Sequence, residues 1–518
     1  MKRVVIVLFV LLTATIAVAQ NNTARIIEGL SMNSAILGQE VKYAIILPED
    51  YFVSKKSYPV VYLLHGLGDN ESSWLEYGRV NQVADKAVAE NQIVPMIFVM
   101  PEGYRNYYVN EYTGKFLYED MFIKELVPFV DKQYRTIADK EHRATLGYSM
   151  GGFGALVLPL RNPHVFTISV PLSTSVRSDE QYKTEDASGW DEQWGRLFGG
   201  VGTTGNDRIT EYYKQHSPFH LFAQKDLQPF RNLKLYIDNG DDEETLCRSN
   251  EELHMLLRDK NFPHEFRVRN GGHEFVYWRD ALPNGLRFIS DTFEGKPYRG
   301  DLKNAPIKMV GNDPKISKII DMDSYSILLP GEYPETQRYY PVIYFIGDFE
   351  SETKKAIASK VQDQIHEGSM PPVIVVFLKK DEEALITTII PKMEKDYRAR
   401  TGFRFRALIG FEKGGITALR YALIPEAFTS CVVFDAPLDC DLLKKARNEN
   451  DKVFSRTWLF MATTDKSLNY QSNGCAHMYL RDQKVYHEYR VQEGMGGMTW
   501  FVNNLTEALN FTQRKIHR

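Results

Sequence analysis

The stretch "HRATLGYSMGGFGAL" (residues 142–156) contains the pattern Gly-x-Ser-x-Gly, centred on Ser149. A short apolar run, "RATLG", precedes the serine, and an apolar stretch typical of a helix, "GGFGALVLPL", follows it. In this strand–turn–helix context the pattern forms a nucleophile elbow, which presents the serine hydroxyl at the edge of a sheet. Glycines are needed beside the serine because side chains there would collide with neighbouring backbone. The stretch therefore predicts an α/β fold with a nucleophilic serine.

The same stretch occurs a second time, as "FRALIGFEKGGITAL" (residues 405–419), with Glu412 in the place of Ser149. Three further pairs of similar segments occur in the same order in the two halves of the chain. They are "YPVVYLLHG" (58–66) with "YPVIYFIGD" (340–348), "VPFVDKQYR" (127–135) with "IPKMEKDYR" (390–398), and "PHEFRVRNGGH" (263–273) with "YHEYRVQEGMGGM" (486–498). Four matches in series predict two copies of one domain.

Short aliphatic runs alternate with stretches of helical periodicity within the first copy. This alternation predicts a mostly parallel sheet covered by helices on both faces. The polar stretch "GKPYRGDLKN" (295–304) is the expected boundary between the copies. We predict a catalytic domain over residues 20–298 and a second domain of the same fold over residues 299–518.

The first nineteen residues predict a secretory signal peptide. Lys2 and Arg3 precede an almost wholly apolar run from Val4 to Ile16, and Ala17-Val18-Ala19 fits the small-residue cleavage rule. An uncleaved membrane anchor is the alternative, but the run is short for a span. We therefore expect a secreted or periplasmic protein with no membrane segment after removal of the signal.

Composition excludes several kinds of partner and site. The 518 residues are 43% hydrophobic and 25% charged, with a net charge of −4 and no basic block, so we expect no nucleic-acid partner. The four cysteines are too sparse for a disulfide framework, although one disulfide among Cys431, Cys440 and Cys475 is possible, with Cys247 left single. No zinc-like spacing occurs, so we expect no metal site and no cofactor. The oligomeric state is not predicted.

A serine hydroxyl is a poor nucleophile unless a base takes its proton. This fold places serine, acid and histidine in that order along the chain, and His273 in "NGGHEF" is the best candidate for the base. The acid is expected in the turn Asp241–Glu244 after the strand "KLYIDNG". Glu243 is the first choice and Asp242 the second, and a carboxylate there would orient the imidazole.

Two backbone N–H groups are expected to bind the developing oxyanion. Met150 follows the serine at the start of a helix, where N–H groups point outward. The segment "HGLG" (65–68) ends the strand "VVYLL", and its loop is expected to supply the second N–H group from Leu67. His65 is interpreted as structural, tying loops together.

The segments "HGLGD", "YEDMFIKELVPFVDKQYR", "GYSMGG" and "GGHEFVYWRDAL" together resemble the esterase D group of α/β-hydrolases. This group includes bacterial feruloyl and acetyl-xylan esterases, S-formylglutathione hydrolases and mycolyltransferases. The resemblance covers Gly29 to Phe293 and continues in degraded form over the rest. It implies two tandem α/β-hydrolase domains and the roles above for Ser149, His273, Leu67 and Met150. The acid turn departs from the family pattern, with one apparent extra residue before Glu243.

The second copy lacks the groups that the chemistry requires. Glu412 replaces the serine, the partner of His273 falls near Met498, and Gly347-Asp348 replaces His65-Gly66. We therefore expect a folded but catalytically silent domain. Trp458 and Trp500 are candidates for stacking on sugars or for the core.

These observations predict an exported serine carboxylesterase that acts on feruloyl or acetyl esters, with plant polysaccharide such as xylan as the expected target. One alternative is an acyltransferase of the mycolyltransferase type, and another is a non-enzymatic carbohydrate-binding or scaffold protein. The tyrosine-rich segment "EGYRNYYVNEYTGKF" (102–116) fits either a substrate wall or a surface loop.

Overall fold

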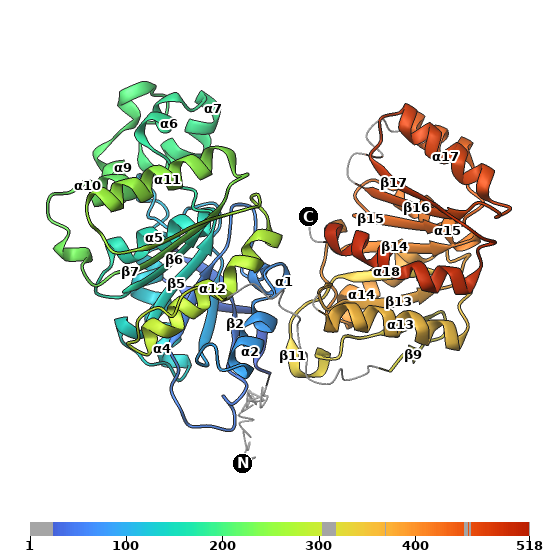
Figure 1. The fold of residues 1–518 in the computed structure, drawn as a ribbon, viewed down its shortest axis with the longest axis horizontal. Coiled ribbons are helices and arrows are strands. Elements are labelled where there is room, and N and C mark those ends of the chain that lie inside the picture. Colours follow the sequence, from blue (N-terminus) through green and yellow to red (C-terminus); the bar gives the residue numbers. More distant parts are fainter. Residues whose placement is uncertain (1–23, 303–317, 368, 450–453, 455–456, 517–518) are drawn as a thin grey trace, which may run out of the picture.

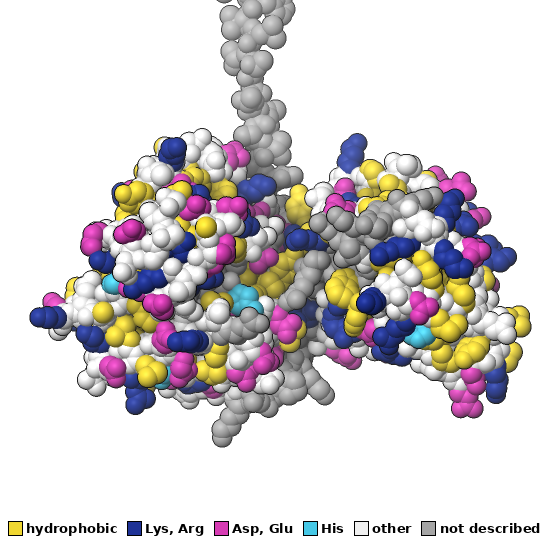
Figure 2. All heavy atoms as spheres, turned by 90° about the horizontal axis from the view of Figure 1, so that it is seen from above, with side chains coloured by type: hydrophobic (Ala, Val, Ile, Leu, Met, Phe, Trp, Pro, Cys, Tyr) yellow, Lys and Arg dark blue, Asp and Glu magenta, His cyan; other side chains and the backbone are white. Residues whose placement is uncertain are grey.

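The computed structural model describes residues 24–302, 318–367, 369–449, 454 and 457–516. The predicted signal peptide (residues 1–19) lies outside the described residues. The chain forms two lobes, each built around one twisted sheet with helices on its faces (Figure 1). Acidic and basic side chains are interspersed over the face of both lobes that Figure 2 shows. Within the described part of the chain, no helix combines the length and apolar character that a bilayer crossing needs.

The first sheet has the strand order β11-β1-β2-β4-β3-β5-β6-β7-β8. Strands β4, β3, β5, β6, β7 and β8 are parallel, whereas β2 is antiparallel to both β4 and β1. The strands are β1 (Ile26–Ser34), β2 (Gln39–Ile46), β3 (Val60–Leu64), β4 (Ile97–Pro101), β5 (Arg143–Tyr148), β6 (Ile168–Leu172), β7 (Lys234–Gly240), β8 (Glu265–Arg269) and β11 (Thr336–Gln337).

Alternate side chains of the buried strands divide between two layers of helices. Tyr62 on β3 packs in the cluster with α4 and α5, whereas its neighbours Val61 and Leu63 pack in the cluster with α2 and α12. The helices of this half are α1 (Ser73–Glu76), α2 (Val80–Ala89), α3 (Tyr118–Met121), α4 (Val127–Gln133), α5 (Met150–Arg161), α6 (Asp179–Thr184), α7 (Ala187–Gly189), α8 (Gly195–Phe198), α9 (Glu211–His216), α10 (Pro218–Ala223), α11 (Glu244–Asp259) and α12 (Phe275–Phe293).

The second sheet repeats this topology, with the order β17-β16-β15-β14-β12-β13-β10-β9. Its strands are β9 (Ile320–Asp321), β10 (Tyr325–Leu328), β12 (Val342–Ile346), β13 (Ile374–Leu378), β14 (Arg406–Phe411), β15 (Ser430–Phe434), β16 (Trp458–Thr464) and β17 (His487–Gln492). Its helices are α13 (Ser351–His366), α14 (Ile390–Asp396), α15 (Lys413–Ala422), α16 (Cys440–Glu449), α17 (Tyr470–Asp482) and α18 (Met498–Lys515). The predicted fold class, two mostly parallel sheets flanked by helices, is confirmed.

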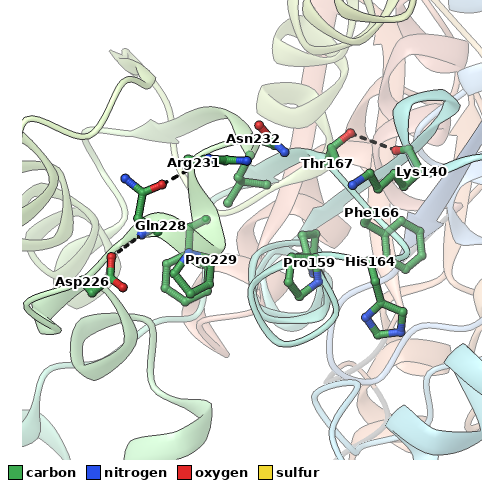
Figure 3. A pocket seen from close by; sticks show the side chains of 13 residues that line it. Lys140, Pro159, His164, Phe166, Thr167, Asp226, Gln228, Pro229, Arg231 and Asn232 are labelled. Atoms are coloured by element: carbon green, nitrogen blue, oxygen red, sulfur yellow. Dashed lines mark hydrogen bonds between the residues drawn. The ribbon is translucent and has the colours of Figure 1, made fainter.

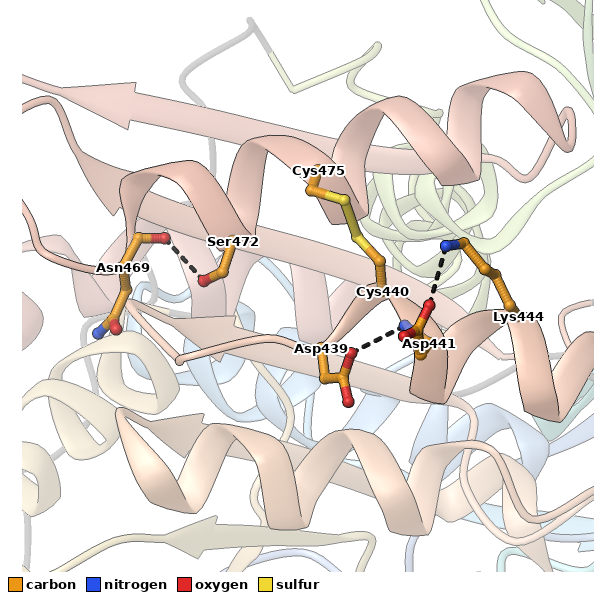
Figure 4. The surroundings of a disulfide bond; sticks show 7 residues. All are labelled: Asp439, Cys440, Asp441, Lys444, Asn469, Ser472 and Cys475. Carbon is orange, nitrogen blue, oxygen red and sulfur yellow. Dashed lines mark hydrogen bonds and ion pairs between the residues drawn. A yellow bond between two sulfur atoms is a disulfide. The ribbon is translucent and has the colours of Figure 1, made fainter.

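The two halves differ most after the strand that follows the elbow. Residues 173–233 of the first half include the group of short helices α6 to α10, whereas in the second half the described residues between β15 and β16 contain α16. There, a disulfide joins Cys440 on α16 to Cys475 on α17 (Figure 4). Cys247 and Cys431 are free, so of the possible pairings the chain adopts Cys440–Cys475.

Two segments beyond residue 298 contact the first half. Arg299 bonds the Asp291 carboxylate (Nε to Oδ1, 2.7 Å), and Arg267 bonds Asp301 (Nε to Oδ2, 2.9 Å). Further on, β11 leaves the second half and pairs in parallel with β1, at Ile26 and Ile27. The division of the chain at residues 298 and 299 therefore stays a prediction, and the first sheet recruits residues from both sides of it.

A histidine pair occurs at the same place in both halves. The Nδ1 of His254 on α11 lies 2.7 Å from the Nε2 of His264, and in the second half the Nδ1 of His477 lies 2.8 Å from the Nε2 of His487. In each pair the second histidine donates its Nδ1–H to a backbone carbonyl two residues earlier, so its Nε2 accepts. Burial lowers the pKa of all four histidines. The pairs are stable when the imidazoles are neutral.

We expect the protein to lose stability as the pH falls below about 6.5, the ordinary pKa of histidine. A pKa that is lower in the folded than in the unfolded state means that unfolding takes up protons, so acid favours unfolding. Burial lowers the pKa of His216 to about 4, so this histidine also favours unfolding in acid. The melting temperature should fall by roughly 3–6 °C between pH 7.5 and pH 5, as measured by circular dichroism.

The variant His254→Asn keeps a donor to His264 but removes one titrating group, so its stability should fall less steeply with pH. His164→Asn, at an exposed histidine, is the control and should follow the wild type. Parallel curves for His254→Asn and the wild type would contradict this origin of the acid sensitivity.

Candidate active site

The elbow lies between β5 and α5, with Ser149 at φ 56° and ψ −119°. Such a conformation is strained for a residue with a side chain. A Cβ atom on Gly151 would lie 2.1 Å from the Leu64 carbonyl oxygen, and one on Gly147 would lie 2.2 Å from the Gly151 carbonyl oxygen. These close approaches require glycine at both positions and hold Ser149 at the carboxyl edge of the sheet.

His273 lies between β8 and α12 and faces both candidate partners. Its Nε2 is 2.9 Å from Ser149 Oγ, and its Nδ1 is 3.3 Å from Glu243 Oε2. Because a carboxylate only accepts, Nδ1 carries the proton and Nε2 offers its lone pair to the serine hydroxyl. This tautomer is the one that a general base needs.

The structure separates the two candidate acids. Glu243 is 5% exposed, and its Oε1 accepts from Gly240 N at 3.0 Å and from the Ser173 hydroxyl. Asp242, the second choice, has an exposed side chain in the same turn. Asp241 binds the backbone instead, since its Oδ1 accepts from Gly271 N at 3.0 Å. The structure therefore brings Glu243 rather than Asp242 to His273.

Two residues that support His273 and Glu243, namely Ser173 and Trp278, were not predicted from the sequence. Trp278 donates its Nε1–H to Ser173 Oγ at 2.7 Å, which leaves the Ser173 hydroxyl free to donate to Glu243. The Trp278 ring packs edge-on against His273 (centroids 5.0 Å apart) and stacks on Tyr148 (4.2 Å). The only signal was a serine directly after a buried strand and a tryptophan five residues after His273. These contacts fix the imidazole relative to the elbow.

The two segments that carry the expected oxyanion donors, the Leu67 loop and the start of α5, follow neighbouring strands. Strand β3 pairs with β5 so that Leu64 lies opposite Gly147, and the loop with Leu67 therefore starts beside the elbow. Met150 is the first residue of α5, so its N–H has no acceptor within the helix. His65 is buried and accepts from Gly103 N at 2.7 Å, which ties the Leu67 loop to the segment after β4.

The tyrosine-rich segment is divided, with residues 106–109 buried near the elbow and residues 112–115 exposed. Tyr107 is 3% exposed and packs on Trp194 of the inserted helical group (centroids 4.6 Å apart). Its hydroxyl lies 3.2 Å from Ser175 Oγ and accepts from Gln193 Nε2 at 2.9 Å. Ser175 N in turn donates to the Ser149 carbonyl at 3.0 Å. Tyr107 and Trp194 therefore belong to the buried packing behind the elbow.

A cavity of about 480 Å³ lies at the other end of the strands. Its lining includes Lys140, which precedes β5, and Phe166 and Thr167, which precede β6 (Figure 3). Since Ser149 follows β5, this cavity lies at the amino ends of the strands and is separate from the serine.

The second half repeats the geometry of the elbow, with Glu412 in the place of the serine. Glu412 has φ 47° and ψ −120°, nearly the conformation of Ser149, and its side chain is exposed. The turn after β16 repeats the first half, since Gly494 N donates to Asp465 Oδ1 as Gly271 N does to Asp241. Counting from this shared bond places Gly496, two residues before Met498, at the position of His273.

The acid and its supporting hydroxyl have exchanged places in the second half. Asp435 stands at the position of Ser173, with φ 46° against 44°, and Ser467 stands at the position of Glu243. The Ser467 hydroxyl donates to Asp435 Oδ1 at 2.5 Å, so a buried hydrogen bond between hydroxyl and acid is present in both halves.

Comparison with known proteins fits this geometry. Residues 34–289 match the model of a family described as putative esterases. This region belongs to that esterase family. The esterase region is similar to an endo-1,4-beta-xylanase/feruloyl esterase of Xylanibacter ruminicola (38% identical over 136 residues, 26% of this chain and 19% of that protein) and to an acetyl esterase of Caldicellulosiruptor saccharolyticus (23% over 252 residues, 46% and 85%).

Among solved structures, a ferulic acid esterase is 29% identical, with a TM-score of 0.43, covering 51% of this chain and 97% of that one. The chain spans only 19% to 24% of the length of the first three curated relatives that it matches. The similarity of the esterase region thus concerns one module, and the activity of the whole chain is a matter for proposal.

We expect Glu243→Gln to slow the reaction of Ser149 with an organophosphonate probe by about 10³–10⁴-fold. The amide of glutamine donates to Nδ1 and so forces the proton onto Nε2, which then offers no lone pair to the serine. Labelling followed by mass spectrometry measures the rate. Asp242→Asn is the matched control and should label within about twofold of the wild type. A larger loss in Asp242→Asn than in Glu243→Gln would transfer the acid role to Asp242.

Proposed function

We propose that the first domain is an exported serine carboxylesterase that removes feruloyl or acetyl groups from plant polysaccharide such as xylan. The observation that carries the proposal is the chain of contacts from Ser149 Oγ to His273 Nε2 and from His273 Nδ1 to Glu243. Such a chain activates a hydroxyl for attack on a carbonyl carbon.

Ser149 attacks the ester carbonyl while His273 takes the hydroxyl proton on Nε2. The resulting imidazolium is stabilised by the Glu243 carboxylate, which the Ser173 hydroxyl and Gly240 N hold in place. The N–H groups of Leu67 and Met150 receive the oxyanion. Collapse of the tetrahedral intermediate transfers the proton to the departing alcohol and leaves an acyl-enzyme on Ser149.

Water then completes the cycle. His273, neutral again, takes a proton from water as the water attacks the acyl carbon, and returns it to Ser149 as the acid leaves. The 37% exposure of the His273 side chain supports access of water to this step.

The choice of acyl group rests on the similar proteins. The names of the similar proteins include a feruloyl esterase and an acetyl esterase. Export rests on the signal-like sequence of residues 1–19.

A panel of aryl esters from acetate to ferulate tests the proposal on the full chain. We expect Ser149→Ala to lower kcat/KM to the uncatalysed background, a loss of about 10⁴-fold or more, because the nucleophile is gone. Glu412→Ala is the matched control at the corresponding turn of the second half and should stay within about twofold of the wild type.

Other outcomes would replace the proposal. A wild-type protein that is inert toward every ester, yet binds xylan, would indicate a binding or scaffold protein. Transfer of the feruloyl group to an added sugar in preference to water would indicate an acyltransferase. A loss in Glu412→Ala equal to that in Ser149→Ala would contradict the catalytic silence proposed for the second domain.

A further inference from the structure

The two halves meet through charged side chains that are buried from solvent. Glu28 on β1 and Glu76 at the end of α1 belong to the first half and are 5% and 1% exposed. Arg400 of the second half bonds both, with Nη2 2.9 Å from Glu28 Oε1 and Nε 2.9 Å from Glu76 Oε2. Arg338, which is 1% exposed, adds a contact of 3.4 Å to the same Glu76 oxygen. Each acid therefore finds its cationic partner across the junction.

Backbone pairing places these groups in register. Strand β11 runs parallel to β1, with Thr336 opposite Ile26 and Gln337 opposite Ile27. Directly after this pairing the register of β1 with β2 shifts, between Ile27 and Leu30, and Glu28 lies within that irregularity. Such a bulge re-aims a side chain, and Glu28 also accepts from Tyr339 N at 2.7 Å. Both the backbone and the side chains of the second half thus bind Glu28.

Glu76 connects this junction to the serine site. Helix α1 is buried throughout, and its Trp74 donates Nε1–H to the Leu64 carbonyl at 3.0 Å. Leu64 is the last residue before the loop that carries Leu67, and its carbonyl is the one that approaches Gly151. The Trp74 ring also packs edge-on against Tyr148 (centroids 5.1 Å apart), the residue before Ser149.

A buried carboxylate is tolerated only when it is paired and hydrogen-bonded. Without Arg400, Glu76 would lose its ion pair at 2.9 Å, and a move of Glu76 toward water would carry α1 with it. Displacement of Trp74 would then loosen both the Leu67 loop and the elbow. Positions of donors and nucleophile matter at the scale of 1 Å.

We propose that the second half acts as an intramolecular brace, in which Arg400 is a positioning residue for the serine site of the first half. It holds Glu28 and Glu76, and through α1 and Trp74 it fixes the oxyanion loop and the elbow. The catalytic part of this inference rests on the esterase function proposed above, whereas the ordering of α1 does not. The brace gives the second half a role that needs neither a nucleophile nor a substrate.

Arg400→Met in the full-length protein tests the brace. Amide hydrogen exchange over residues 64–78 should become about tenfold faster. For aryl acetate, kcat should fall by about ten- to a hundredfold with KM within about twofold, because the site is misaligned rather than blocked. Arg406→Met is the matched control, since Arg406 is paired with Glu394 inside the second half, and it should leave both measurements near the wild type.

Arg400→Lys tests the proposed brace if Arg400→Met does not fold. Lysine keeps the charge but cannot bond two carboxylates with a planar fork, so exchange over residues 64–78 should still accelerate and kcat should fall. A folded Arg400 variant with wild-type exchange in this segment, or with effects no larger than those of Arg406→Met, would overturn the brace. If the wild type hydrolyses no ester, the exchange result and the rate of organophosphonate labelling of Ser149 still decide the inference, while the esterase proposal fails separately.

Discussion

The close backbone approach between the elbow and β3 is the constraint on which the site depends. Gly151 lies so near the Leu64 carbonyl that any side chain there would force the two segments apart. Because β3 and β5 are neighbours in register, this contact places the Leu67 loop, the start of α5 and Ser149 at one edge of the sheet. The strain at Ser149 is sustained because the surrounding packing leaves the turn no other shape.

The second half shows that this constraint belongs to the fold rather than to the reaction. A Cβ atom on Gly414 would lie 2.1 Å from the Ile346 carbonyl oxygen, the same approach as in the first half, although Glu412 occupies the nucleophile position. The exchange of Ser173 and Glu243 for Asp435 and Ser467 follows the same logic. A buried carboxylate needs a donor whether or not it orients an imidazole, so a pair of carboxylate and hydroxyl occurs in both halves.

The sequence predicted the parts of the site that depend on local pattern. Hydrophobic runs, glycine positions and chain order were sufficient to group Ser149 with His273 and with the turn that holds Glu243. They could not decide between Glu243 and Asp242, because that choice depends on Ser173, which comes from a different strand. The histidine pairs and the Arg400 contacts were invisible for the same reason: they join residues from distant segments that have no motif in common.

The way in which the edge strands are protected explains why the two halves meet at β1. An open edge strand invites pairing with another chain, and charged side chains discourage it. The edge strand β8 carries Glu265, Arg267 and Arg269, and β17 repeats this with Glu488 and Arg490, so both copies protect the same edge. The opposite edge, at β1, is instead covered by β11. The two halves are therefore joined at this edge, where Arg338 follows the covering strand and Arg400, from the segment after α14, bonds Glu28 and Glu76.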